Sequence, residues 1–260
     1  MGGILFNEIV FGPIKSRRLG ISLGINLLPT DSKYCTFNCV YCECGWNRKA
    51  EGKPILPTRK QVAEALENKL SLYADVADEE KPNSITYAGN GEPTIHPEFS
   101  GIVEDTVRLR NKYLPEAKIT VLSNATLIKR EEIFDALSMV DNNVLKLDAG
   151  TEEMCRRINQ PGDSFDFNRM LFLLKKFHGN CIVQTLFLKG SYNGREIDNT
   201  TDEEVELWLE LLKEIKPKSV MIYPIDRETP AHDLEKIDQA TLEAIAKRVE
   251  SLGIKALVYA

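Results

Sequence analysis

The sequence has no apolar run that approaches the roughly 18 residues a helix needs to cross a membrane. Its first residues, 1–8, also lack the basic and apolar stretches of a secretory signal peptide. A net charge of −6 means that there is no general basic surface, so a nucleic-acid partner is possible but not favoured. We therefore expect a cytoplasmic protein that does not insert into a membrane.

Histidine is also scarce, and no second group of metal ligands can be found. The three histidines, His96, His178 and His232, lie far apart, and none has a cysteine or histidine partner at ligand spacing. Cys155 and Cys181 are isolated, which fits a reducing compartment rather than a disulfide framework.

No long linker, low-complexity tract or internal repeat interrupts the 260 residues, of which 43% are hydrophobic. An α/β barrel of this length forms one domain, so we expect a single domain over residues 1–260. Apolar, β-branched runs alternate with segments of helical periodicity. The expected strands are 21–27, 84–88, 118–123, 143–147, 181–188 and 219–223, with 254–259 as a further candidate.

Capping residues mark the expected helix ends. Residues 58–61 and 201–204 both have the pattern of a capping box, Asp238 is expected to cap another helix, and Pro97 suits a first turn. Alternating strands and helices predict right-handed βαβ units and a mostly parallel sheet. We favour an α/β fold of the partial (β/α)6 TIM-like barrel type, with a doubly wound open sheet as the alternative. In both, the site lies at the carboxyl ends of the strands.

Three cysteines, Cys35, Cys39 and Cys42, lie within eight residues and follow the first expected strand. Thiolates are soft ligands that bind iron–sulfur clusters or zinc. A set of three leaves one coordination position without a local ligand, and an open position is where a metal site meets its substrate. A zinc knuckle has a second ligand pair further along the chain, which is missing here, so the spacing favours a cluster.

Cys35-x3-Cys39-x2-Cys42 resembles the cluster-binding loop of the radical S-adenosylmethionine (SAM) superfamily. The resemblance implies that these cysteines bind three irons of a [4Fe–4S] cluster and that SAM chelates the fourth. It also implies that Tyr41, at a position where the family often has an aromatic residue, lies near the adenine of SAM. Cys44 adds a fourth thiol. Because a one-residue spacer is awkward for two ligands of one cubane, we expect Cys44 to be a bystander, a redox-sensitive thiol or a ligand in a damaged cluster.

Gly89-Asn90-Gly91-Glu92 follows the next expected strand and resembles the GGEP motif of the same superfamily, with Asn90 between the glycines. The resemblance implies that backbone carbonyls of this segment and the Glu92 carboxylate bind the amino group of SAM. Glycine allows a close approach to the backbone, and a carboxylate accepts hydrogen bonds from an ammonium.

Polar residues at the ends of further strands are candidates for the rest of the site. In relatives, a residue at such a strand end binds the ribose of SAM, and the candidates here are Ser123, Asn124 and Asp148. Gln184 and Thr185, on the fifth expected strand, either face the site or lie within the strand.

Two further features have both a functional and a plain interpretation. Cys155 is a candidate catalytic hydrogen donor, although a free cysteine on a helix is commonly a small buried residue. The run that contains Lys15, Arg17 and Arg18 is the most basic one near the site. Its arginines suit a carboxylate or phosphate, and a solvated edge is the alternative.

The sequence from this basic run through the cysteine loop resembles a radical SAM branch related to the tRNA wyosine-synthesis enzymes, so we expect a radical SAM enzyme of that branch. The resemblance implies reductive cleavage of SAM to a 5′-deoxyadenosyl radical, which abstracts hydrogen from a small molecule, a peptide or a nucleotide. A one-electron reductant such as flavodoxin or ferredoxin is then an expected partner under anaerobic conditions. The alternatives are a tRNA-modifying enzyme and a non-catalytic zinc or iron–sulfur electron-transfer module.

Overall fold

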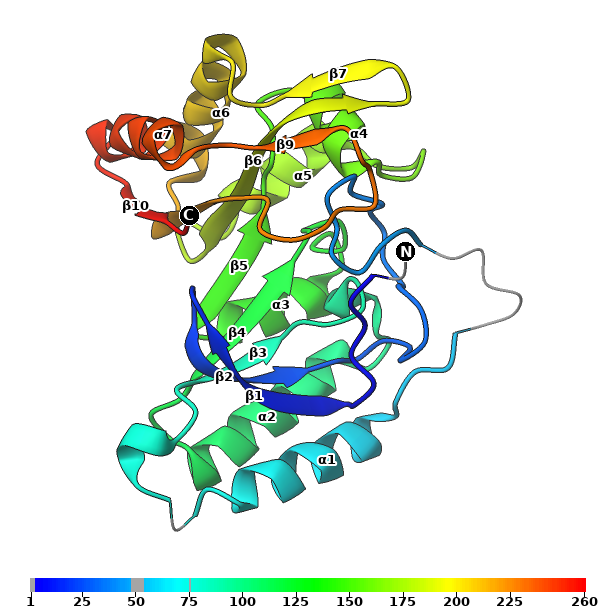
Figure 1. Cartoon of the computed structure of the whole chain (residues 1–260). Helices are drawn as coiled ribbons and strands as arrows, with labels where there is room; N and C mark the ends of the chain where they lie inside the picture. Colours follow the sequence, from blue (N-terminus) through cyan, green and yellow to red (C-terminus); the bar gives the residue numbers. More distant parts are fainter. Residues whose placement is uncertain (1–2, 48–53, 75) are drawn as a thin grey trace.

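The structure, a computed structural model, describes residues 3–47, 54–74 and 76–260. Its centre is a curved sheet with the strand order β1-β2-β3-β4-β5-β6-β8-β10 (Figure 1). From β2 onward along this order, neighbouring strands pair in parallel. These strands are β2 (Gly20–Ile25), β3 (Ser84–Tyr87), β4 (Lys118–Ser123), β5 (Asn142–Lys146), β6 (Ile182–Tyr192), β8 (Ser219–Pro224) and β10 (Lys255–Val258).

Helices alternate with these strands, and α1, α2 and α3 lie along the outer face of the sheet (Figure 1). The sheet order begins at β1 and ends at β10, so the barrel is partial. The predicted α/β class and partial-barrel fold are therefore confirmed. The helices are α1 (Arg59–Ser71), α2 (Phe99–Tyr113), α3 (Glu131–Met139), α4 (Glu152–Asn159), α5 (Phe167–Lys175), α6 (Asp202–Ile215) and α7 (Gln239–Ser251), with the 3-10 turns η1 (Asp78–Glu80) and η2 (Pro93–Ile95).

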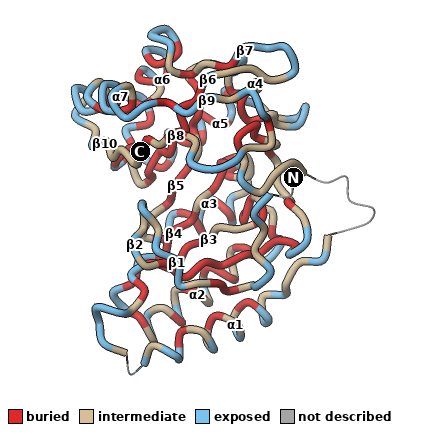
Figure 2. The backbone as a smooth tube through the Cα atoms, in the orientation of Figure 1, coloured by how far each residue is buried: buried red, intermediate tan, exposed pale blue. Residues whose placement is uncertain are grey.

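The main core lies between the sheet and its helices, and Figure 2 shows the buried positions along the strands. Successive side chains of a strand point to opposite faces, so a second, smaller cluster forms from the other face. It consists of Val144, Ile182 and Met221, with Leu19 packed against it. Leu19 precedes β2, so the turn before β2 covers the inside of the barrel near the amino ends of the strands.

Three antiparallel strands were not predicted. β1 (Val10–Ser16) pairs with β2 although it contains the strand-breaking pair Gly12-Pro13. β7 (Arg195–Asp198) and β9 (Leu234–Lys236) both pair with the second half of β6, which explains why β6 continues beyond its expected end. All described strands belong to one sheet, which favours the predicted single domain.

The helix caps were predicted with mixed success. The capping box at residues 58–61 and the Asp238 cap of α7 are confirmed. The placement of Pro97 was wrong, because α2 begins at Phe99 and Pro97 lies outside it. Pro93 instead occupies a first helical position, in η2. Within the described part of the chain, no helix combines the length and apolar character needed to span a membrane.

The predicted capping box of α6 forms only in part. The Thr201 side chain accepts the N–H of Glu204, as expected. The Glu204 carboxylate does not complete the box but accepts the N–H of Gly150 at 3.0 Å and the hydroxyl of Thr151. Glu204 thereby connects α6 to the loop after β5, which carries part of the site.

Candidate active site

The three clustered cysteines lie on a loop at the carboxyl ends of β2 and β3, where parallel α/β sheets bind their ligands. On one side, the N–H of Tyr34 donates to the carbonyl of Asn90 at 2.7 Å, and the N–H of Glu92 donates back to the carbonyl of Tyr34 at 3.2 Å. On the other side, two N–H groups of the loop donate to carbonyls at the end of α4, each at 2.9 Å. The backbone therefore holds the loop between β3 and α4.

Two of the cysteine sulfurs accept hydrogen bonds from amide groups. The sulfur of Cys35 accepts from the N–H of Phe37 at 3.4 Å and from the side-chain amide of Asn124 at 3.5 Å. The sulfur of Cys39 accepts from the side-chain amide of Asn159 at 3.4 Å. Such donors stabilise negative charge on sulfur and tune the potential of a bound iron–sulfur cluster.

The third sulfur lies beside a buried cation. The adjacent Cys44 thiol and the charge of Lys33 lower the pKa of Cys42 to about 5, although burial opposes this. Lys33 is 4% exposed and donates to the carbonyl of Gly45 at 3.0 Å. Burial lowers the pKa of Lys33, but the neighbouring thiols raise it by more. Lys33 therefore stays charged and offsets part of the negative charge of the thiolates.

The three thiols are ligands of the kind that iron–sulfur clusters use. Over residues 3–47, 54–74 and 76–260, no three or more His, Cys, Asp or Glu side chains converge on the position of one metal ion. In a [4Fe–4S] cubane the thiolates bind different irons, so their sulfurs surround a volume rather than a point. Burial raises the pKa of Cys35 to about 12 and also raises that of Cys39. These two thiols therefore need a metal to become thiolates at neutral pH.

Cys44, the surplus thiol, is directed at the second motif. It donates to the carbonyl of Gly89 at 3.3 Å. Its hydrogen bond with Cys42, together with burial, raises its pKa. The bond to the Gly89 carbonyl engages the Cys44 thiol with the second motif, which agrees with the interpretation of Cys44 as a bystander.

The two glycines of the second motif are required because neighbouring segments of the protein leave no room for a side chain there. Gly91 has a φ of +142°, and a Cβ atom there would lie 1.9 Å from the carbonyl oxygen of Tyr34. Gly89 has a φ of +151°, and its Cβ would lie 2.6 Å from the side-chain oxygen of Asn26. Only glycine allows this approach of β3 to the cysteine loop.

Asn90 has a structural role that the motif did not indicate. Its side-chain amide donates to the carbonyls of Phe6 at 2.8 Å and Pro29 at 2.7 Å, and its oxygen accepts the N–H of Phe6 at 2.8 Å. These bonds attach the N-terminal segment and the start of the cysteine loop to the end of β3. The side chain of Asn90 is thus engaged within the protein, away from the cysteine sulfurs.

Glu92 is 2% exposed and connects β3 to the end of β4. Its Oε1 accepts the hydroxyls of Thr94 at 2.5 Å and Ser123 at 2.8 Å, and its Oε2 accepts the N–H of Asn124 at 2.6 Å. Burial raises the pKa of Glu92, and these bonds oppose the rise. A carboxylate oxygen has two acceptor positions, and among the described residues Oε2 accepts a single hydrogen bond. The structure therefore brings the candidates Glu92, Ser123 and Asn124 together.

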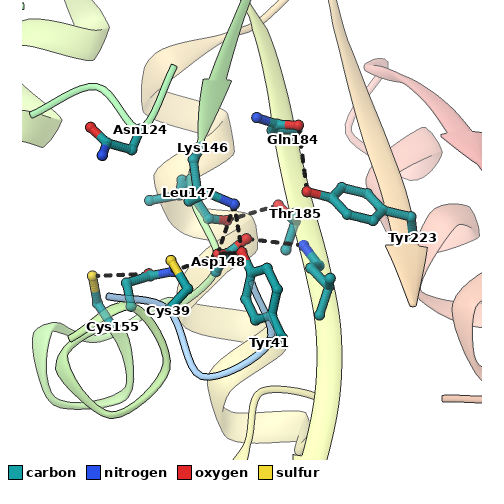
Figure 3. Close-up of polar contacts among 12 residues, drawn as sticks. Cys39, Tyr41, Asn124, Lys146, Leu147, Asp148, Cys155, Gln184, Thr185 and Tyr223 are labelled. Atoms are coloured by element: carbon teal, nitrogen blue, oxygen red, sulfur yellow. Dashed lines mark hydrogen bonds and ion pairs between the residues drawn. The ribbon is translucent and has the colours of Figure 1, made fainter. Parts of the chain in front are cut away.

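Asp148 and Tyr41, 107 positions apart in the sequence, belong to one buried polar network (Figure 3). The hydroxyl of Tyr41 donates to Oδ2 of Asp148, which also accepts the amide of Asn159 at 2.7 Å. The Lys146 ammonium lies 3.3 Å from the same oxygen, and the Asp148 side chain has an exposed fraction of 0%. Asp148 therefore connects Tyr41, in the cysteine loop, to Asn159 at the end of α4.

Burial and the neighbouring charges determine the protonation of Tyr41 and Lys146 in this network. Burial and the Asp148 carboxylate raise the pKa of Tyr41, so the phenol stays neutral and acts as a donor. Burial lowers the pKa of Lys146, but Asp148, Tyr223 and Cys39 together raise it by more, so the lysine stays charged. The ammonium of Lys146 also lies 5.0 Å from the centre of the Tyr41 ring. Tyr41 is thus held at both its hydroxyl and its ring.

Cys155 contacts Asn159, which in turn contacts Cys39 in the cysteine loop. Its thiol donates to Oδ1 of Asn159 at 3.5 Å, and burial raises its pKa. It is 3% exposed and belongs to the main core. This position favours a packed core residue, and the hydrogen-donor role stays a prediction.

Asn159 and Lys33 were missed by the sequence reasoning. No local pattern marks Asn159, which contacts Cys39 from 120 positions away. Lys33 could have been predicted from its position, because a lysine two residues before a candidate thiolate ligand is well placed to offset the charge of that thiolate.

A cavity of about 390 Å³ connects the cysteine loop to the turn before β2. Tyr41, Cys42 and Cys44 line it, and so does the segment 15–18, which contains the predicted basic run. A second cavity, of about 690 Å³, is lined by Cys44 and by the segment that follows β8. The basic run therefore faces the same space as the cysteine loop.

Residues 30–240 of the chain match the Radical SAM superfamily. This protein belongs to the radical SAM superfamily. It is therefore an enzyme, and its cofactors are a [4Fe–4S] cluster and SAM. The matched range contains both motifs and the Lys146–Asp148 network, and the predicted membership is confirmed.

Two relatives place this radical SAM enzyme further. A UPF0026 protein of Synechocystis sp. is 30% identical over 272 residues, which cover 94% of each chain, so the chain also belongs to that family. A protein of Brachyspira hyodysenteriae with the name GTPase Obg is 27% identical over 93% of this chain. The present chain spans only 33% of the length of that relative.

Three solved structures have a fold similar to that of this chain. A radical SAM methyltransferase from Sphaerobacter thermophilus has a TM-score of 0.66 at 14% identity, over 92% of this chain and 65% of that one. SuiB from Streptococcus suis, bound to SAM, has a TM-score of 0.62 at 18% identity, over 91% and 49%. Archaeal TYW1 has a TM-score of 0.52 at 14% identity, over 88% and 71%. At these identities the likeness shows the fold alone.

Proposed function

We propose that Cys35, Cys39 and Cys42 bind three irons of the [4Fe–4S] cluster and leave the fourth iron to SAM. The observation that carries this proposal is the set of amide donors around the sulfurs. Asn124, beyond the end of β4, and Asn159, at the end of α4, both donate to cysteine sulfurs from outside the loop. Outer-shell donors of this kind orient metal ligands and tune the bound metal.

When bound, the reduced cluster supplies the electron that cleaves SAM to methionine and a 5′-deoxyadenosyl radical, which takes hydrogen from the substrate. The residues of the chain orient SAM and shield it from water. The remaining acceptor position of Glu92 Oε2 supports a contact with the SAM amino group. The ring of Tyr41 lines the cavity next to Cys42, which supports a position beside the adenine.

The chain further requires a source of single electrons, for which a flavodoxin or a ferredoxin is the expected partner. Its substrate is a small molecule, a peptide or a nucleotide that reacts next to SAM. The cavity of about 390 Å³ at the cysteine loop supports a reacting group of modest size there.

Cysteine variants test the assignment. Cys35→Ala, Cys39→Ala and Cys42→Ala, each reconstituted anaerobically with iron and sulfide, are expected to lose the visible absorbance of the cluster and most of their iron. With a chemical reductant and SAM, they should form no 5′-deoxyadenosine. Cys181→Ala removes another buried cysteine, outside the site, and should retain iron and product. Cys44→Ala should retain iron as well.

The alternatives give other results in the same experiment. A zinc module would contain zinc and no iron, and an electron-transfer module would contain iron but form no 5′-deoxyadenosine. A tRNA-modifying enzyme would show salt-sensitive RNA binding that depends on the segment 15–18. Unchanged iron content and SAM cleavage in Cys39→Ala would refute the cluster assignment.

A further inference from the structure

Arg18 is held inside the barrel by neutral groups. Its guanidinium lies 4.6 Å from the centre of the Tyr223 ring, and its Nη1 donates to Oε1 of Gln184 at 3.2 Å. Gln184 is 5% exposed and also accepts the hydroxyl of Tyr223, at 3.4 Å. Two residues of β6 and β8 therefore fix both the plane and the direction of this guanidinium (Figure 3 shows the Gln184–Tyr223 pair).

The neighbouring arginines differ from Arg18 because each has a carboxylate. Arg17 pairs with Asp226 at 2.7 Å, and Arg227 pairs with Glu43 at 2.7 Å. In the part of the chain that the structure describes, no carboxylate lies within ion-pair distance of Arg18. A partly buried charge without a counter-charge is unfavourable, so its retention points to a ligand that supplies the negative charge.

The position of Arg18 relates it to the reacting groups. Arg18 lines the cavity of about 390 Å³ together with Tyr41 and Cys42. Leu19, the next residue, packs against the small apolar cluster of Val144, Ile182 and Met221. Lys15 lines the same cavity and adds a second positive charge. Arg18 therefore lies between this apolar cluster and the cysteine loop.

We propose that Arg18 binds one oxyanion, a carboxylate or a phosphate, of a molecule that enters this cavity. A guanidinium presents several donors in a planar fork, and the bond to Gln184 uses only one of them. The anion is either part of the substrate or the carboxylate of SAM. The inference deepens the proposed function, on which it rests, by naming the group that the cavity recognises.

Inorganic phosphate is the probe for this site. The Tm of the anaerobically reconstituted full chain is measured against phosphate concentration, with chloride at equal ionic strength as the reference. The wild type should show a saturable rise in Tm. Arg18→Gln should weaken phosphate binding by about tenfold or more, because it removes a charge-assisted bond. Arg18→Lys keeps the charge but loses the planar fork of donors, so its affinity for phosphate should lie between those of the wild type and Arg18→Gln.

Arg169→Gln is the matched control. Arg169 also lies over an aromatic ring, that of Phe172 at 5.7 Å, but it lines a different cavity. The variant loses the same charge and should bind phosphate as the wild type does, within about twofold. An equal loss in both variants would mean general charge screening and would overturn the proposal.

Gln184→Glu tests the same site without removal of the arginine. The new carboxylate would replace the oxygen that now lies 3.2 Å from Arg18 and would form an internal ion pair. Phosphate should then no longer raise the Tm. This variant keeps the proposal testable if Arg18→Gln does not fold. Retained phosphate binding in Gln184→Glu would count against the proposal.

SAM distinguishes the two sources of the anion. If Arg18 holds the SAM carboxylate, Arg18→Gln weakens SAM binding by about tenfold and saturating SAM abolishes the phosphate effect. If it holds the substrate, SAM binding is unchanged and phosphate still raises the Tm of the SAM complex. A wild type without any phosphate effect would overturn the proposal. Cysteine variants that retain iron would instead refute the cluster assignment and leave this result untouched.

Discussion

Asn159 donates its side-chain amide both to the sulfur of Cys39, at 3.4 Å, and to Oδ2 of Asp148, at 2.7 Å. The oxygen of the same side chain accepts the thiol of Cys155. One asparagine therefore connects the cysteine loop, the end of β5 and the core of α4. Since it is 1% exposed, its bonds are not shared with water.

Asn159→Ala is expected to make the midpoint potential of the cluster more negative. The lost N–H···S bond no longer stabilises the added negative charge of the reduced state. A bond of about 1 kcal/mol corresponds to a shift on the order of 40 mV for one electron. A redox titration followed by electron paramagnetic resonance (EPR) measures it.

The matched control is Asn199→Ala. Asn199 is 2% exposed and donates to the backbone carbonyl of Asp148 at 2.7 Å, without a bond to sulfur. Its removal should lower stability and leave the potential unchanged. Equal potentials in the wild type and both variants would show that the Asn159 bond does not tune the cluster.

Tyr41→Phe is expected to lower the free energy of unfolding by about 1–2 kcal/mol, because Asp148 loses one buried donor. The ring remains, so the affinity for SAM should change little. Urea unfolding and SAM binding measure the two effects. Tyr223→Phe, which removes a longer bond of 3.4 Å to Gln184, should be less destabilising. A larger loss in Tyr223→Phe would contradict the role given to the Tyr41 hydroxyl.

Glu204→Ala is expected to destabilise the fold by about 1–3 kcal/mol, because the N–H of Gly150 and the hydroxyl of Thr151 lose their acceptor. Both groups lie in the loop that follows β5, so local hydrogen exchange there should become faster. Glu203→Ala changes an exposed neighbour in the same helical turn and serves as the control. Equal unfolding midpoints for the two variants would be inconsistent with the observed bonds.

The parallel strands that carry the site were predicted from the sequence. The parallel strands β2, β3, β4, β5, β6, β8 and β10 were found because apolar, β-branched runs mark buried parallel strands. β1 was missed because Gly12-Pro13 is a strand-breaking signal, and β7 because two of its four residues are exposed.

Contacts between distant segments explain the remaining errors. The cysteine spacing identifies the loop, but the contact of Asn159 with Cys39 depends on where α4 packs. The roles of Asn90 and Glu204 likewise followed from side chains whose partners lie far away in the sequence. Local patterns such as the motif at residues 89–92 and the capping box at 201–204 cannot specify such partners.

Stability should depend on pH through Asp141. Partial burial raises its pKa, but the N–H of Ile119 and the charges of Arg110 and Lys118 together lower it below the usual 3.8. A group whose pKa is lower in the folded than in the unfolded state stabilises the protein at pH values above its unfolded-state pKa. This stabilisation is lost as the pH falls through the folded-state pKa. Asp141→Asn should therefore cost about 1 kcal/mol near pH 7 and almost nothing near pH 2. Urea unfolding at both pH values tests this, and an equal cost at both would contradict it.

The EPR spectrum of the reduced, reconstituted protein, recorded with and without SAM, tests the central claim most directly. If Cys35, Cys39 and Cys42 bind three irons, the fourth iron is open, and SAM should change the spectrum of the wild type. Cys44→Ala should show the same change, because Cys44 donates to the carbonyl of Gly89 instead of binding iron. A cluster spectrum that SAM leaves unchanged in both proteins would contradict the account.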